Sequence, residues 1–297
     1  GPFQDPRVDL EGTARRVEVE SVRLEEVNAS FRVRRLLKAP EGLLRLEVLK
    51  EGTTLSARAD VILDRPTLEA RKVSFEGAGM RVSGGLTAHL PSGTVTGDLN
   101  GEVPDLASVG DLLGMDLGGS AGFALHLSRE RTGQAATVDL RIEEAASELG
   151  NADRITLQGN VRGLFAKPAG AITARAEGIR TGGTRVDALD LAADGTVDDL
   201  SFHLQGSGEL GSPFRVSTRG GIHRSASATR LALETLEGTI GPHPVRLAGP
   251  AEIHVQQQPL FRTPGLTLRL GAGSLALEGA YGDEMDLGAH LDRKSVV

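Results

Sequence analysis

The predicted fold is determined by Leu266-Thr267-Leu268-Arg269-Leu270, which a glycine turn joins to Ser274-Leu275-Ala276-Leu277-Glu278-Gly279. A second turn leads to Asp286-Leu287-Gly288-Ala289-His290-Leu291. Apolar residues occupy alternate positions, and polar or small residues stand between them. This period of two is typical of a β-strand with one apolar and one polar face. The stretch therefore predicts amphipathic strands joined by turns at residues 271–273 and 279–284.

The same alternation runs along most of the chain. Apolar residues spaced two apart recur from Val22 to Leu90 and again from Phe123 to Val255, separated by Gly, Pro or charged turns. The strand-plus-turn unit returns roughly every 8–14 residues. No fixed sequence period accompanies it, which argues against a short-repeat solenoid. The count comes to more than roughly 20 strands, and well over half of the chain is predicted to be strand.

So many strands favour one long sheet over an ordinary globule. Open sheets rarely exceed about 10 strands without curling or splitting. Neighbouring strands lie about 4.8 Å apart, so roughly 20 of them would extend about 100 Å, and their right-handed twist would coil the sheet into a gutter. We therefore predict an all-β fold with a long, curled, antiparallel-rich sheet. Closure of both edges would give a sandwich or barrel, whereas open edges would leave a hydrophobic groove.

The alternation breaks once, at residues 104–117. Asp105 is a suitable N-cap for a helix there, and Gly114 is a suitable stop. A helix of about ten residues is not stable alone, so its apolar side must dock on the sheet. We predict a short amphipathic insert between two groove segments of the same sheet, residues 1–103 and 118–297. Four apolar residues at helical spacing form its docking side: Leu106, Val109, Leu112 and Leu113.

Composition narrows what the apolar side of the strands can contact. Hydrophobic residues make up 39% of the 297 residues, but aromatic residues only 3%, with one Tyr and no Trp. An all-β core is usually filled by aromatic side chains, which bury the most area per residue. Here the apolar surface is almost entirely Leu, Val, Ile and Ala. Acyl chains are as natural a partner for such a surface as a second sheet.

Charge and the remaining composition exclude several classes. The net charge of −7, from 40 acidic and 33 basic residues, argues against a nucleic-acid partner. Without Cys there is no disulfide, thiol chemistry or Cys-ligated metal. No apolar run approaches the roughly 18 residues of a spanning helix. Gly1-Pro2 matches the scar of a common tag protease, so we expect an excised fragment.

Two glycine motifs resemble catalytic or phosphate-binding signatures. Gly118-Gly119-Ser120-Ala121-Gly122 matches GxSxG, but a nucleophile elbow needs a strand before it and a helix after it, and the predicted order here is the reverse. Gly206-Ser207-Gly208-Glu209-Leu210-Gly211 matches GxGxxG, but no helix follows to offer its N-terminus to a phosphate. We predict that the second motif is a turn between strands.

The titratable residues form no catalytic or metal-binding pattern. The seven His residues are scattered without HxH or HExxH spacing, and His126, His203, His254 and His290 fall on the polar side of their strands. Adjacent carboxylate pairs such as Glu143-Glu144 lie at predicted turns or strand ends, where they keep edges solvated. Adjacent strand residues point to opposite faces and make poor acid–base pairs. We expect no enzymatic activity, no metal and no cofactor.

Two interpretations of the apolar side remain open. Physical reasoning alone favours the core of a closed β-sandwich. The shortage of aromatic residues and the number of strands favour a groove that accommodates lipid. For the groove, the candidate lining residues are Phe31, Val33, Leu46, Val61, Phe75, Leu125, Leu140, Leu157, Phe202, Leu204, Leu231, Leu233, Val245, Leu247, Ile253, Val255, Leu266, Leu268, Leu270, Leu275, Leu277, Leu287 and Leu291.

The C-terminal third resembles a known family. Its segments Leu231-Ala-Leu233-Glu-Thr-Leu236-Glu-Gly238, Pro244-Val-Arg-Leu247-Ala-Gly-Pro250-Ala and Gly273-Ser-Leu275-Ala-Leu277-Glu-Gly279 look like the TamB family of translocation and assembly module subunits. The similarity is to the segment just ahead of that family's C-terminal conserved domain. Pro104-Asp-Leu106-Ala-Ser-Val-Gly-Asp-Leu112-Leu-Gly114, followed by Leu117-Gly-Gly119, resembles the short helical insert between the family's strands.

The resemblance implies a fold, a setting and partners. TamB-like proteins are AsmA-like, bridge-like lipid transfer proteins with a folded-over sheet, the β-taco, and a hydrophobic groove along it. They are anchored in the inner membrane by an N-terminal helix, span the periplasm of Gram-negative bacteria and meet the outer-membrane barrel TamA. They are implicated in phospholipid transport and outer-membrane protein assembly. On this basis both the anchor and the barrel contact lie in parts absent from this sequence.

These expectations give three functional hypotheses. The leading one is a periplasmic groove that shields phospholipid acyl chains between the inner and outer membranes and supports outer-membrane protein assembly. A second is an assembly factor that receives outer-membrane strands by β-augmentation. A third is a sealed β-sandwich or β-helix of adhesin-like, structural type. An outer-membrane barrel fits least, because the aromatic girdles are missing.

Overall fold

The protein is an all-β protein with one short helix. The computed structural model describes residues 7–19, 22–35, 40–50, 52–131, 133–225, 228–255, 261–281 and 285–293, with some side chains undescribed within strands. These residues form 20 strands and one helix, with 80% of the chain in strands. The predictions of an all-β fold and of antiparallel pairing are thus confirmed.

The chain divides into two compact units. Unit 1 comprises residues 1–149 together with 162–165, and unit 2 comprises residues 150–161 together with 166–297. The predicted helical insert therefore lies inside unit 1, and both units consist mainly of antiparallel strands.

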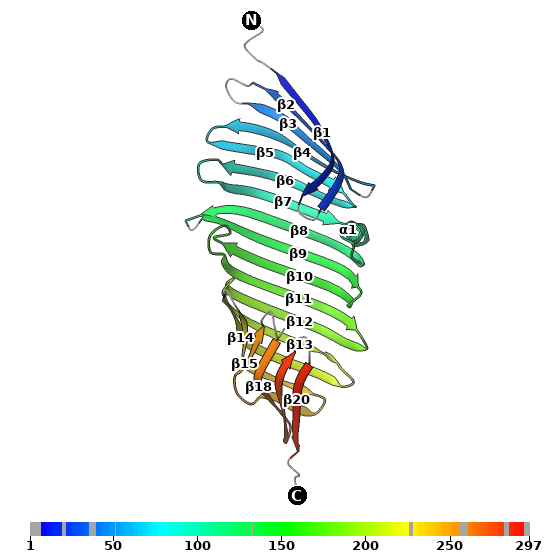
Figure 1. Ribbon diagram of the computed structural model, residues 1–297, viewed down its shortest axis with the longest axis vertical. Helices are drawn as coiled ribbons and strands as arrows, with labels where there is room; N and C mark the ends of the chain where they lie inside the picture. Colours follow the sequence, from blue (N-terminus) through cyan, green and yellow to red (C-terminus); the bar gives the residue numbers. More distant parts are fainter. Residues whose placement is uncertain are drawn as a thin grey trace. The chain divides into compact units, whose positions relative to one another are not determined.

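Unit 1 is a nine-stranded meander with one helix. Each strand pairs antiparallel with its neighbour in sequence, so that β1 to β9 follow one another from blue to green in Figure 1. The first and last of them do not pair with each other among the described residues, so the sheet of this unit is not closed. The strands are β1 (Val8–Val19), β2 (Val22–Arg34), β3 (Glu41–Lys50), β4 (Thr53–Asp64), β5 (Thr67–Gly77), β6 (Met80–His89), β7 (Thr94–Val103), β8 (Leu117–Glu130) and β9 (Gly133–Ser147).

The predicted helix is present as α1 (Leu106–Leu113). Asp105 is its N-cap and accepts a hydrogen bond from the Ala107 N–H at 3.0 Å. Gly114, in the left-handed region with φ of 69°, ends it. Lys50 Nζ donates to the Leu112 carbonyl at 2.6 Å, which places a cation at the negative end of the helix dipole. Both predicted helix ends are confirmed, and α1 lies beside the strand ends at one margin of unit 1 (Figure 1).

Unit 2 continues the same construction with eleven strands. From β11 onward each strand pairs antiparallel with its neighbours. The exceptions are β16 and β17, which share one position: both pair with β15 on one side and β18 on the other. Pro250, which has no N–H to donate, lies in the interruption between these two short strands. The strands are β10 (Gly150–Arg162, its last residue belonging to unit 1), β11 (Ala169–Thr181), β12 (Thr184–Thr196), β13 (Asp199–Glu209), β14 (Pro213–Arg224), β15 (Thr229–Ile240), β16 (His243–Leu247), β17 (Ala251–Val255), β18 (Phe261–Leu270), β19 (Gly273–Tyr281) and β20 (Met285–Arg293).

The segment from Leu266 to Leu291 forms strands with the predicted alternation. Leu266 stands opposite Leu277, and Leu268 stands opposite Leu275. Leu275 in turn stands opposite Leu291 on β20. Opposed residues share a face, so the alternate leucines of β18 and β19 lie on one side of the sheet, as their spacing predicts.

One local prediction was wrong because a strand runs through glycine. Gly206 to Glu209 belong to β13, not to a turn, since Gly206 pairs with Val216 and Gly208 with Phe214. Gly118 to Gly122 lie inside β8, at a register shift. Glu143 and Glu144 lie near the end of β9, which continues to Ser147. A glycine within a strand marks a bulge or a close neighbour as often as a turn.

The units have no deeply buried core. No large side chain among the described residues is fully buried, and the buried apolar side chains are small: Val33, Ala59, Val103, Ala135, Ala152, Val245 and Ala251. The accessible surface is 19731 Å², whereas two separate compact domains of half this mass would together expose roughly 14,000 Å². The sheet therefore leaves much of its apolar side chains in contact with solvent.

Candidate ligand-binding face

One face of the unit 1 sheet is apolar from β2 to β9. Strand register settles which residues share it, because directly opposed residues project to the same side. One row runs Leu46, Ala57, Phe75, Val82 and Gly101 across five strands. On the other side, the corresponding rows carry Arg45, Arg58 and Ser74. We call the two sides the apolar and the polar face of unit 1.

The apolar face continues across β7, β8 and β9. Leu99 stands opposite Leu125, which stands opposite Val138. Away from the strand ends, no described residue on this face from β2 to β9 is charged. Besides glycines, the face consists of Val27, Ala29, Phe31, Val33, Leu44, Leu46, Val48, Leu55, Ala57, Ala59, Val61, Leu63, Leu68, Ala70, Val73, Phe75, Val82, Leu86, Ala88, Val95, Leu99, Val103, Ala121, Phe123, Leu125, Leu127, Ala136, Val138, Leu140 and Ile142.

Unit 2 has an apolar face of its own. One row runs Ala174, Leu191, Leu204, Thr218 and Leu236 from β11 to β15. Thr218 is the polar member, and it is buried and satisfied, since its Oγ1 donates to the Thr235 carbonyl at 2.8 Å. The hydroxyl is thus turned to the backbone and leaves only its methyl group for this face.

Aromatic rings on these faces lie beside glycines. A Cβ added to Gly101 would collide with the ring of Phe123 on the neighbouring strand, and one added to Gly220 would collide with the ring of Phe202. Phe31 stands in the same relation to Gly42. Each ring therefore covers the backbone of a glycine and lies low on the sheet. The result is a smooth aliphatic surface rather than one with protruding rings.

Many side chains of the apolar faces remain accessible. Leu44 is 41% exposed, Leu46 37% and Ile172 37%. A contiguous apolar surface of more than a few hundred Å² is rare on a monomer and marks an interaction site. The two apolar faces are therefore the strongest candidate sites in the chain.

The polar faces carry short networks of hydrogen-bonded charges. Arg71 donates from Nε and Nη2 to the two carboxylate oxygens of Glu69, at 2.7 and 2.8 Å. These hydrogen bonds lower the pKa of Glu69 and raise that of Arg71. A hydrogen bond from Asn28 and the nearby Arg15 lower the pKa of Glu26 in the same way. All these groups are solvated, so they keep the polar face in water and add little stability.

Unit 2 also has an open depression on its polar face. It has a volume of about 520 Å³ and spans β10 to β13. Arg175, at its centre, is already engaged by Glu177 at 2.8 Å and Asp190 at 2.9 Å, which raise its pKa. No aromatic residue lines the depression. It is bounded by Thr156, Gln158, Thr173, Ala174, Arg175, Asp190, Leu191, Ala192, His203 and Gln205.

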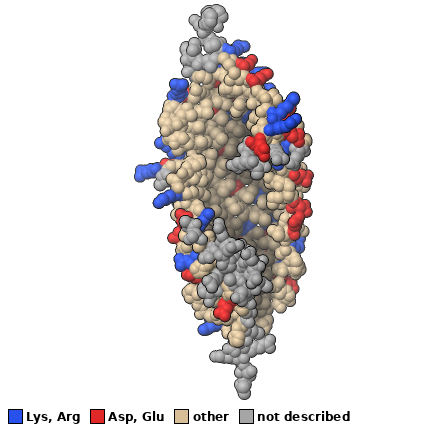
Figure 2. All heavy atoms as spheres, in the orientation of Figure 1, with Lys and Arg blue, Asp and Glu red and all other residues tan. Residues whose placement is uncertain are grey.

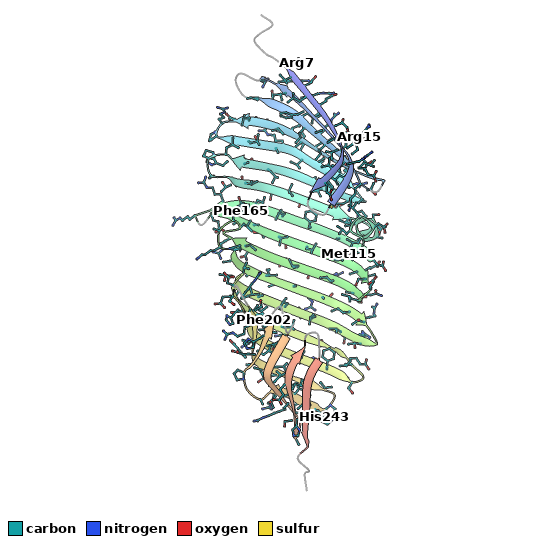
Figure 3. The ribbon with its side chains drawn as sticks, in the orientation of Figure 1. Arg7, Arg15, Met115, Phe165, Phe202 and His243 are labelled. Atoms are coloured by element: carbon teal, nitrogen blue, oxygen red, sulfur yellow. The ribbon has the colours of Figure 1, made fainter. Side chains whose placement is uncertain are left out.

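Figure 2 shows the distribution of charge over unit 1. Uncharged atoms occupy the middle of the visible face over β4 to β9, and Lys, Arg, Asp and Glu lie along its margins (Figure 2). The polar face carries Arg45 and Arg58 near its centre, so the side turned to the viewer is the apolar face. Figure 3 places Phe165 and Met115 at opposite margins of the same strands, and both are exposed, at 83% and 55%.

The strand register places the predicted lining residues on these faces. Those in unit 1 lie on its apolar face: Phe31, Val33, Leu46, Val61, Phe75, Leu125 and Leu140. In unit 2, Leu157 lies between Thr156 and Gln158 of the polar depression and so belongs to the opposite side. The register puts on that same side Phe202, Leu204, Leu231, Leu233, Val245, Leu247, Ile253, Leu266, Leu268, Leu270, Leu275 and Leu277. For Val255, Leu287 and Leu291 the strands are described but the side chains lie outside the described part.

The structure differs from the sequence predictions at one residue of α1 and at several residues of the apolar faces. Leu106, Val109 and Leu112 of α1 are half-buried, but Leu113 is 61% exposed, so its predicted docking was wrong. Gly114, the C-cap of α1, directly follows Leu113, and β8 begins three residues later at Leu117. Several apolar-face residues were not predicted as lining although they follow the same period of two, among them Leu44, Leu99, Phe123, Leu191 and Leu236.

No cluster of three or more His, Asp or Glu side chains suited to a metal ion occurs in the described ranges. The only helix there, α1, is too short to span a bilayer. Comparison with protein-family models, with curated proteins and with solved structures finds no match for this chain.

Proposed function

We propose that the apolar faces bind the acyl chains of phospholipids and shield them from water during transfer between two membranes. One observation carries the proposal: among the described residues, the apolar face of unit 1 has no charged side chain away from the strand ends from β2 to β9, and it remains partly accessible. A protein core of this composition would be covered. A surface left open needs an apolar partner that is itself fluid and variable in shape.

The energetics suit a ligand that slides. Burying one CH₂ group stabilises by about 0.8 kcal/mol, wherever along an aliphatic surface it is buried. Leu, Val and Ala recur in every row of the face, and the rings of Phe31 and Phe123 lie over glycines. An acyl chain therefore meets nearly the same surface at each step. The length of acyl chain that is buried therefore sets the binding free energy, and no single position along the face is preferred.

An open groove, of the β-taco type, is the arrangement that fits this function. The uncharged middle of unit 1 is recessed between charged margins in Figure 2, which supports a groove in that unit. The resemblance to the TamB family supports the setting: the periplasm, with an inner-membrane anchor, a TamA-like outer-membrane barrel and a contribution to outer-membrane protein assembly. These partners would be met through other parts of the protein.

A second candidate is the acceptance of an outer-membrane strand by β-augmentation. Among the described residues, β1 pairs only with β2, which leaves a twelve-residue edge strand without a second neighbour. Exposed edges of this kind are templates for strand addition. Crosslinks from β1 to a nascent barrel strand, in the absence of crosslinks to lipid, would favour this candidate over acyl-chain binding.

Charge placed on the apolar face tests the leading proposal. Leu44→Asp with Leu46→Asp introduces two carboxylates among the acyl chains, whereas Leu43→Asp with Leu49→Asp puts them on the polar face of the same strand. Desolvating a carboxylate is strongly unfavourable. We expect the first variant to lose about tenfold or more of its co-purifying phospholipid, measured by mass spectrometry.

The control variant should retain its lipid, and circular dichroism should show that both variants keep their β-structure. If the wild-type protein carries no lipid, or if the two variants lose it equally, the acyl-chain proposal is wrong.

A further inference from the structure

Unit 1 has one basic and one acidic margin. In an antiparallel meander, alternate connections lie along the same margin of the sheet. The connections β2–β3, β4–β5, β6–β7 and β8–β9 therefore share one margin, and the β3–β4, β5–β6 and β7–β8 connections share the other. Residues 162–165 belong to the first margin, since the Leu164 N–H donates to the Gln134 carbonyl at 3.1 Å at the start of β9.

The first margin is rich in arginine. Its three carboxylates, Glu41, Asp64 and Glu130, are outnumbered two to one by arginines at the ends of strands and in the turns. We call this set the basic rim: Arg34, Arg35, Arg65, Arg129, Arg131 and Arg162.

The opposite margin is acidic. Asp105, Asp111 and Asp116 flank or belong to α1, and Glu102 and Glu148 end their strands nearby. Its bases include Lys50, which contacts the C-terminus of α1, and Arg81, which stands opposite Glu102. In Figure 2 the left margin of unit 1 is mainly blue and the right margin mainly red. The two sides of the apolar face thus differ in the sign of their charge.

Most arginines of the basic rim are free to bind a ligand. Arg35 forms an ion pair with Glu41 at 2.8 Å, but no described carboxylate pairs with Arg34, Arg65, Arg129, Arg131 or Arg162. All of these are exposed. By contrast, on the polar face Arg71 forms an ion pair with Glu69, and Arg141 forms one with Glu143.

The basic rim also adjoins the apolar face directly. Arg129 stands two residues after Leu127 in β8, so both project to the same side of the sheet. The residue opposite Arg129 on β9 is Gln134. Arg65 stands two residues after Leu63, the last apolar-face residue of β4. A ligand whose chain lies against Leu63 or Leu127 would therefore have its polar end beside an unpaired guanidinium. Arginine is the side chain best suited to bind phosphate, through two parallel N–H···O hydrogen bonds.

We infer that the basic rim is a binding site for the phosphate of a lipid whose acyl chain lies on the apolar face of unit 1. This inference rests on the proposed acyl-chain binding and adds the place of the headgroup, its orientation and the arginines that hold it. Along this margin successive turns are two strands, or about 9.6 Å, apart. The β6–β7 turn carries no arginine, so the basic rim consists of the arginines of the β2–β3 and β4–β5 turns and, separately, those of the β8–β9 turn with Arg162.

Two lipids with the same acyl chain test the inference. Oleoyl lysophosphatidic acid carries a phosphate, and monooleoylglycerol carries none. Their affinities are measured by titration against the full chain and against the variant Arg65→Gln, Arg129→Gln, Arg131→Gln. The matched control is Arg45→Gln, Arg58→Gln, Arg81→Gln, which removes three exposed arginines from the polar face that also lack ion pairs.

We expect the wild type to bind lysophosphatidic acid more tightly than monooleoylglycerol. The rim variant should lose about tenfold of its affinity for lysophosphatidic acid, since an exposed charge pair is worth roughly two- to threefold, and should bind monooleoylglycerol as before. The control variant should match the wild type for both lipids. Raising the salt concentration should reduce the preference, because the rim is exposed.

The results that would overturn the headgroup inference differ from those that would overturn the proposed function. Equal wild-type affinities, or equal losses in the rim and control variants, would overturn the headgroup inference while leaving acyl-chain binding intact. Inorganic phosphate that binds the rim as tightly as the phospholipid would show a free-anion site and would also overturn it. If neither lipid binds, the proposed function fails as well, and the inference with it.

Discussion

Gln134 illustrates how a single side chain completes the sheet where two strands diverge. It is 4% exposed, and its amide mimics a peptide group: Oε1 accepts from the Val95 N–H at 2.7 Å, and Nε2 donates to the Val95 carbonyl at 2.6 Å. The amide also donates to the Ser128 carbonyl at 3.0 Å. One side chain thus joins β7, β8 and β9 beside the basic rim.

Gln134→Ala should destabilise the protein markedly. The substitution leaves the Val95 N–H and C=O without protein partners, and each buried unsatisfied group costs about 1–3 kcal/mol. We expect the free energy of unfolding in urea to fall by roughly 2 kcal/mol. Gln205→Ala, an exposed glutamine on the polar face, is the control and should change it little. Equal effects of the two substitutions would contradict this role for Gln134.

No feature of the sequence distinguishes Gln134 from the other glutamines. It lies at the start of a strand, and its partner Val95 is 39 positions away. The basic rim escaped prediction for a related reason, although arginines stand at three of the four turns along this margin. Turn residues are grouped along one margin only after the pairing order of the strands is known.

At the scale of the element, strands and helix follow from local pattern. The period of two predicts the apolar-face residues of β18 and β19, and helical spacing with an N-cap and a terminal glycine predicts α1. The wrong prediction concerned residues 206–211, whose glycines predict a turn but which lie largely in β13. Whether a glycine faces a turn or a neighbouring ring depends on the residue opposite it in the adjacent strand.

The contact between the ring of Phe123 and Gly101 predicts opposite effects on stability for alanine substitutions at two glycines on adjacent strands. Gly101→Ala places a Cβ against the ring of Phe123, so the ring must leave its position. Overpacking of this kind costs about 1–3 kcal/mol. Gly122→Ala, on β8, meets only the Gly101 carbonyl at 3.8 Å, an ordinary contact. It should be neutral or stabilise by up to about 1 kcal/mol, because alanine loses less entropy on folding.

Urea denaturation of the two variants measures these effects. If Gly101→Ala is as stable as Gly122→Ala, the ring of Phe123 does not rest on the glycine backbone, and the smooth surface that we assign to this face is wrong at that position.

At the scale of the whole molecule, the sequence predicts strands but not what covers them. An amphipathic strand satisfies the same pattern whether its apolar side meets a second sheet, a lipid or water. The low aromatic content favoured an open face, and the absence of a deeply buried side chain in the described residues agrees with it. Ligand class depends on the charge at the margins, which becomes visible only in three dimensions.

The most direct test of acyl-chain binding is to map where a bound chain lies. A fatty acid with a diazirine in its acyl chain is photolysed on the purified protein, and the crosslinked residues are identified by mass spectrometry. We predict adducts on apolar-face residues such as Leu44, Leu99 and Leu191, and none on their polar-face neighbours Arg45, Asn100 and Asp190. Adducts distributed equally over the two faces, or no adducts on the apolar faces, would contradict the account.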